Sequence, residues 1–161
     1  MEIIQIPLSK MAIFAYLVGD PESGNCAVID PAFNTERILA CAREKGWTIT
    51  QVINTHCHPD HTAGNAAMIK ATGASLSLHR LDAPKLRVFS ALMFSMILGG
   101  RRSPDADHLL EDKDPIPVGS GKLDVIHKQR FLCSLARCSG NALGSGIGLP
   151  DPTNKYFEFP T

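Results

Sequence analysis

Three histidines and one aspartate lie within six consecutive residues, in the segment Thr55–His61 (THCHPDH). Side chains of this kind are costly to bury without partners, so their clustering indicates metal binding rather than packing. Neutral imidazoles suit zinc or iron, and a mixed carboxylate and imidazole pair suits a second ion of the same kind. Two such ions can hold a hydroxide near neutral pH, which is a nucleophile for a carbonyl carbon.

The residues before the cluster must position it. Ile49–Asn54 is predicted to be a strand that runs directly into the histidines. Because side chains two apart on a strand point to the same face, His56 and His58 are expected to reach one metal while Cys57 points away. Pro59 ends the strand because it has no N–H, and the following turn brings Asp60 and His61 beside the first pair.

The other predicted elements describe a layered α/β domain. Asn34 and Gly46 are predicted to bound a first helix, and Thr62 and Gly73 a second. A further helical segment is predicted over residues 81–98. The predicted strands are residues 2–8, 12–18, 26–30, 49–54, 74–79, 115–120 and 122–127.

The bulk composition excludes several classes of protein. Sixteen basic and sixteen acidic residues give a formal net charge of zero, which counts against nucleic acid as the main partner. The apolar run at 88–98 is shorter than the roughly 20 residues that a membrane span needs. It fits a buried or lid helix, or alternatively a dimer-forming one. No signal peptide is recognisable and the five cysteines form no framework, so we expect a cytoplasmic protein without a membrane partner.

The HxHxDH pattern resembles the metallo-β-lactamase superfamily, and within it the glyoxalase II-like branch. Asp30-Pro31, Gly64-Asn65 and the stretch from residue 116 to 127 are also similar to that family, so the resemblance covers residues 2–127. It implies an αββα sandwich with the metal site at one edge, between the sheets.

The resemblance also implies the roles of the motif residues. His56 and His58 would bind the first metal, and Asp60 and His61 the second. Asp60 would in addition act in catalysis by orienting the attacking water. The cofactor would be two divalent ions, with zinc expected first and iron or manganese left open. The substrate would be a small molecule.

The similarity to the family ends after His127. The family continues with a loop that carries a third histidine ligand, then a bridging aspartate and a final histidine. Here no histidine follows 127, and Asp151 is the sole aspartate after it. We therefore expect the first half of the fold over residues 1–127 and a divergent tail over 128–161, which a frameshift or truncation would explain. His79 and His108 are interpreted as surface or packing residues.

Two functions follow as hypotheses. The first is a metal-dependent hydrolase in which metal-bound hydroxide attacks a thioester or a related ester or lactam. Phosphodiester hydrolysis fits less well because basic residues are not in excess. Oxidation at iron stays an open alternative, because the same ligands serve it. The alternative is a truncated, catalytically impaired metal-binding remnant, which would expose an apolar sheet face and could form a homodimer.

Overall fold

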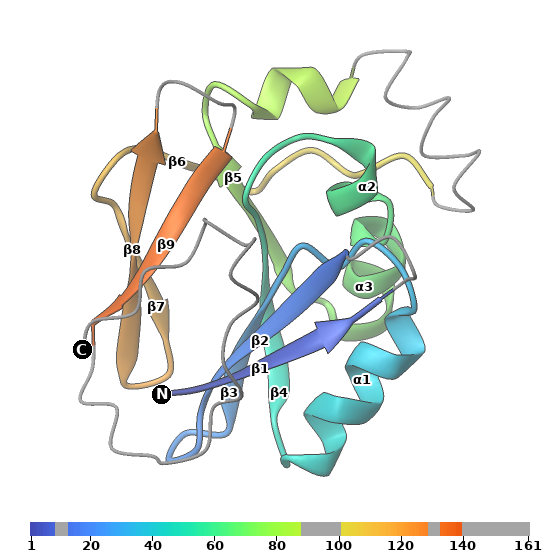
Figure 1. The fold of residues 1–161 in the computed structure, drawn as a ribbon, viewed down its shortest axis with the longest axis vertical. Helices are drawn as coiled ribbons and strands as arrows, with labels where there is room; N and C mark the ends of the chain where they lie inside the picture. Colours follow the sequence, from blue (N-terminus) through green and yellow to red (C-terminus); the bar gives the residue numbers. More distant parts are fainter. Residues whose placement is uncertain (9–12, 88–100, 129–132, 140–161) are drawn as a thin grey trace.

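The computed structural model describes residues 1–8, 13–87, 101–128 and 133–139 (Figure 1). Two sheets form the framework, one of six strands and one of three. The first contains β1 (Glu2–Pro7), β2 (Phe14–Asp20), β3 (Asn25–Ile29), β4 (Thr48–Asn54), β5 (Ser75–His79) and β6 (His108–Leu110). The second contains β7 (Pro115–Val118), β8 (Gly121–Lys128) and β9 (Cys133–Ser139). The helices are α1 (Thr35–Glu44), α2 (Pro59–Thr62), α3 (Asn65–Thr72) and a 3₁₀ helix at Ala83–Arg87.

The six-stranded sheet changes from antiparallel to parallel pairing at β3. β1, β2 and β3 form an antiparallel meander, whereas β3, β4, β5 and β6 run parallel in chain order. Parallel neighbours need crossover connections, which α1 supplies between β3 and β4, and α2 with α3 between β4 and β5. The carboxyl ends of β3, β4 and β5 therefore meet at one edge of the sheet. This is the edge where parallel sheets position their ligands.

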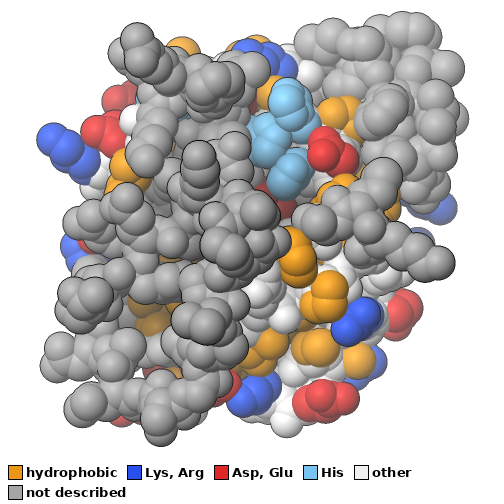
Figure 2. All heavy atoms as spheres, in the orientation of Figure 1, with side chains coloured by type: hydrophobic (Ala, Val, Ile, Leu, Met, Phe, Trp, Pro, Cys, Tyr) orange, Lys and Arg blue, Asp and Glu red, His pale blue; other side chains and the backbone are white. Residues whose placement is uncertain are grey.

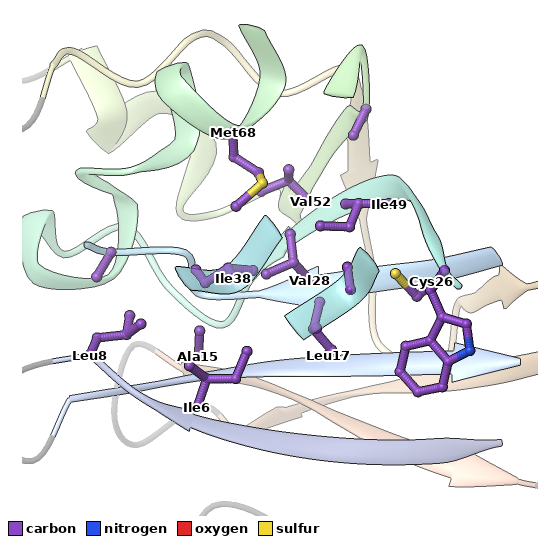
Figure 3. Packing of buried hydrophobic residues seen from close by; sticks show 14 of the residues in the cluster. Ile6, Leu8, Ala15, Leu17, Cys26, Val28, Ile38, Ile49, Val52 and Met68 are labelled. Carbon is purple, nitrogen blue, oxygen red and sulfur yellow. The ribbon is translucent and has the colours of Figure 1, made fainter. Parts of the chain in front are cut away.

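Strand alternation divides the apolar core between the two faces of this sheet. Val28 and Val52 pack with Ile38 of α1 and Met68 of α3 on the helical face (Figure 3). On the other face, Ile29 and Ile53 pack against a second cluster from β7 and β8, formed by Ile116, Val118, Leu123 and Val125. The described residues thus form a helical layer and two stacked sheets, which are the first three layers of the predicted αββα sandwich.

The predicted second helix is wrong at its start, whereas Gly73 caps its end as predicted. It was expected from Thr62 to Gly73, but the chain forms the one-turn α2 from Pro59 and, after Ala63 and Gly64, the separate helix α3. Pro59 occupies the first turn of α2, where the missing N–H has no cost. The helical period of the sequence did not show the break at Ala63 and Gly64.

Other elements differ from expectation in smaller ways. The segment predicted as a helix over 81–98 is a 3₁₀ helix at Ala83–Arg87, and residues 88–98 lie outside the described part of the chain. The predicted hairpin around Gly119 is confirmed as β7 and β8. The strands β6 and β9 were not predicted. β9 pairs with β8 along seven residues, from Lys122↔Ser139 to Lys128↔Cys133, while the domain boundary at 127 stays a prediction.

Gly64 lies where no larger residue fits. A Cβ atom built on it would be 1.7 Å from the carbonyl oxygen of Pro31. This close approach seats the turn between α2 and α3 against the end of β3, beside the histidine cluster.

Gly64→Ala should therefore lower the free energy of unfolding by about 3 kcal/mol, since backbone must shift to make room. Gly46→Ala is the matched control: Gly46 has φ 70° and open space around it, so its cost should be about 1 kcal/mol of backbone strain. Urea unfolding followed by the fluorescence of Trp47, the single tryptophan, measures both. Equal losses in the two variants would contradict the close approach.

Candidate metal centre

The motif residues follow the carboxyl end of β4, but they lie beyond the strand itself. β4 ends at Asn54, His58 is the extended residue that precedes α2, and Asp60 and His61 lie within α2. The four-residue helix folds the second half of the motif back over the first. The predicted pairing of His56 and His58 along a strand is thus replaced by a loop and a helical turn that bring all the imidazoles together.

The three imidazole rings form one compact group. The ring centroid of His56 lies 4.5 Å from that of His58 and 4.2 Å from that of His61. Asp60 joins the group through its Oδ2, which is 3.6 Å from His61 Nε2. Figure 2 shows histidine side chains gathered at the surface beside an acidic side chain. His56 is buried, whereas His58 is exposed, so the group has a closed side and an open side.

Asp30 is the buried carboxylate behind this group. It directly follows β3 and has φ 50°. Its oxygens accept hydrogen bonds from the Thr55 backbone N–H at 2.8 Å and the Thr55 hydroxyl at 2.5 Å, and one lies 3.0 Å from His61 Nδ1. The Asn54 amide donates to the same carboxylate at 3.4 Å. The carboxylate therefore ties the end of β3 to the end of β4 and to α2.

Electrostatics in this group follow from burial and pairing. Burial alone would raise the pKa of Asp30, but its hydrogen bonds and the charge of His61 outweigh that effect and lower it. The reverse holds for His61, where Asp30 raises the pKa in spite of burial. For His56, burial first and the charge of His61 second lower the pKa to about 4. His56 is thus neutral at neutral pH, which is the form that binds a metal.

Asp30 has the geometry of a positioning residue. One ligand-type atom each from Asp30, His56 and His61 lie within 4.8 Å of one another, so the three could hold an ion together. The Asp30 oxygens, however, are already occupied by Thr55, Asn54 and His61. With Nδ1 facing Asp30, His61 has Nε2 free on the side of Asp60. A carboxylate that orients a ligating histidine in this way is common behind metal sites.

A buried amide pair holds the helical side of the centre. Asn65 at the start of α3 donates to Asn54 Oδ1 at 2.6 Å and to the Ser103 hydroxyl at 2.8 Å. Asn54 in turn donates to the carbonyl of His61 at 3.3 Å. Both asparagines are fully buried. Through Asn54, the pair fixes the main chain of His61 to the end of β4.

The remaining histidines and Cys57 lie apart from this group. Cys57 packs with Leu78 and Leu86, and burial raises the pKa of its thiol to about 11, so it is not prepared as a ligand. His108 is exposed on β6. His127 stacks on His79 and does not join the group of Asp30, His56 and His61.

The donor set fits a divalent metal. Neutral imidazoles, the Asp60 carboxylate and an open side suit zinc, iron or manganese, and none of these donors selects one ion over the others. His56, His58, Asp60 and His61 are the predicted ligands. The sequence indicated Asp30 through its place beside Pro31 but not its role. One signal could have revealed the role of Asp30. It directly follows a buried strand, β3, that runs parallel to β4, the strand before the motif.

Comparison with known proteins assigns the family. The family model of the metallo-beta-lactamase superfamily matches residues 9–131, and the chain belongs to this superfamily. A hydroxyacylglutathione hydrolase of Nitrosococcus oceani is 45% identical over 138 residues, which cover 83% of this chain and 46% of that protein. One of Polaromonas sp. is 59% identical over 66 residues, covering 41% and 25%. The chain thus spans half or less of the length of these relatives.

Solved structures confirm the fold. The B3 metallo-beta-lactamase BLEG-1 superposes with a TM-score of 0.72 at 20% identity, covering 85% of this chain and 67% of that one. TTHA1623, solved in a di-iron-bound form, gives a TM-score of 0.62 at 25% identity, covering 77% and 60%. The resemblance to the glyoxalase II-like branch and the predicted fold class are confirmed.

In the described residues, no helix is long and apolar enough to cross a membrane.

The positioning role of Asp30 can be tested by Asp30→Asn. The uncharged amide has one acceptor oxygen where the carboxylate uses two, so His61 should lose its fixed orientation. We expect zinc affinity to fall by about 10- to 100-fold in a competition titration with a chromophoric chelator.

Asp20→Asn is the matched control. Asp20 is also buried and accepts a backbone N–H, from Ser120 at 2.8 Å, but it ends β2 at the opposite edge of the sheet. Its zinc affinity should stay unchanged. An Asp30→Asn protein that binds zinc like the unaltered chain would refute the positioning role.

Proposed function

We propose that this chain is the metal-binding half of a hydrolase that acts on thioesters of a small thiol. The observation that carries the proposal is the convergence of His56, His58, Asp60 and His61 at one sheet edge, with Asp30 behind them. The relatives named hydroxyacylglutathione hydrolase support a glutathione thioester as the substrate class. Two divalent ions, zinc or alternatively iron or manganese, are part of the proposal.

The chain's own residues would bind the ions and orient the attacking water. His56 and His58 would hold the first ion, and Asp60 and His61 the second. The ions would supply an activated water and positive charge for the oxyanion that develops at the carbonyl. Asp60 would orient the water, because its carboxylate is partly exposed and lies on the open side of the group.

Asp30 would act through His61 and not on the substrate. Its lowered pKa keeps it ionised at neutral pH, where it favours the His61 tautomer with a free Nε2. The Asn54–Asn65 pair would hold the same histidine through its main chain. Ligand orientation in this centre would thus depend on three buried polar side chains that do not themselves touch the substrate.

The alternative is a chain that binds metal but hydrolyses nothing by itself. The position of His127 favours it, since this histidine stacks on His79 and leaves the described centre with predicted ligands from residues 56–61 alone. Catalytic zinc sites normally have three protein ligands for each ion. A homodimer or a longer form of the protein would supply further ligands. A cytoplasmic location remains a prediction.

An assay of hydroxyacylglutathione hydrolysis by the zinc-loaded chain separates the two functions. The free thiol that the reaction releases is measured. We expect turnover that a strong chelator abolishes and added zinc restores. His58→Ala should reduce it at least about 100-fold, because an exposed ligand is lost without loss of core packing.

His108→Ala is the control, since this exposed histidine lies outside the motif. It should leave turnover unchanged. A metal-loaded, folded chain with no thiol release would reject the hydrolase proposal for this chain in favour of the metal-binding remnant.

A further inference from the structure

Two histidines outside the metal centre form a contact between the two sheets. His79 is the last residue of β5 in the six-stranded sheet, and His127 lies near the end of β8 in the other sheet. Their rings are parallel within 4°, with centroids 3.9 Å apart. In β8, Leu123, Val125 and His127 share one face, so His127 extends the row of side chains buried between the sheets. We call this pair the histidine stack.

The hydrogen bonding of the stack requires neutral rings. The backbone N–H of Leu81 donates to His79 Nδ1 at 3.3 Å, so this nitrogen must have a free lone pair. His79 is only 3% exposed. The Nδ1 of His127 is also buried and has no hydrogen-bond partner in the described part of the chain. A proton on either Nδ1 would thus break an acceptor contact or create a buried donor without a partner.

The charged groups around the stack compensate such a proton only in part, because Asp82 and Glu111 each raise the pKa of His79 less than burial lowers it. Arg80, Asp82, Glu111 and Asp112 are the described charged residues that face it. Glu111 pairs with Arg80 at 3.4 Å, and Asp82 with Lys85 at 2.8 Å.

Asp112 is engaged as well, because its carboxylate accepts the backbone N–H of His127 at 2.9 Å. Each nearby carboxylate therefore has another partner. Burial first, and the neighbouring His127 second, lower the pKa of His79.

We propose that the histidine stack is a pH-sensitive contact that joins the two sheets while both rings are neutral and weakens when either ring is protonated. It lies at the edge of the sheet that carries the metal centre, because His79 follows Leu78, which pairs with Asn54 just before the motif. Acidification would loosen the two sheets beside the centre. The proposal is independent of the function proposed above.

The direction of the pH effect follows from proton binding. Free histidines in an unfolded chain take up protons below about pH 6.5, whereas His79 in the folded stack resists a proton. The unfolded state therefore binds more protons below that pH, and stability decreases as the pH falls. The contribution of the stack is complete above about pH 6.5 and is lost as the pH falls through the lowered pKa of His79.

The test compares urea unfolding midpoints of the metal-free, 161-residue chain at pH 7.5 and 5.5, followed by Trp47 fluorescence. His79→Phe keeps a ring for stacking but removes the histidine whose pKa is lowered in the stack. Its midpoint should change with pH by less than half as much as that of the unaltered chain. His108→Gln removes an exposed histidine from β6 and should retain the full change.

An NMR titration of the imidazole resonances in the unaltered chain gives a second measurement that needs no variant. At least one ring of the stack should titrate well below the ordinary value of about 6.5. Two rings that both titrate at the ordinary value would overturn the proposal. Equal pH dependence in His79→Phe and the unaltered chain would overturn it as well.

Discussion

The contact between the Asp30 carboxylate and His61 is the constraint on which the rest of the centre depends. Asp30 is buried, and its oxygens are within 3.0 Å of donors from Thr55 and His61. A buried carboxylate with fewer partners would be costly, so the ends of β3 and β4 and the helix α2 must stay together. The same bonds direct His61 Nε2 toward Asp60. The same contacts therefore stabilise this edge and orient His61, a predicted metal ligand.

The layers of the fold explain why this requirement can be met. Crossover connections place the carboxyl ends of β3, β4 and β5 at one edge, so residues 30, 55 and 79 are neighbours although they are far apart in sequence. Helices cover one face of the sheet and the β7–β8 hairpin covers the other. The close approach of Gly64 to Pro31 and the buried Asn54–Asn65 pair then fix α2 and α3 against this edge.

Much of this arrangement could be predicted from the sequence, because it rests on local patterns. Short apolar segments separated by turn residues predicted the strands of the meander, and the motif residues indicated the candidate metal centre. What could not be predicted depends on tertiary contacts. The close approach of Gly64, between α2 and α3, depends on Pro31. The role of Asp30 depends on His61, and the strand β9 on its pairing with β8. His79, interpreted as a surface or packing residue, is buried against His127 of the other sheet.

The central claim is that residues 56–61, positioned by Asp30, bind metal in this chain. Metal content per chain, measured by elemental analysis of the gel-filtered protein after zinc loading, tests it most directly. We expect about two ions per chain in a discrete, folded species, as a centre of two neighbouring ions requires. A discrete, folded species with well below one ion per chain would contradict the account, because the ligand-type residues would then be assembled without binding.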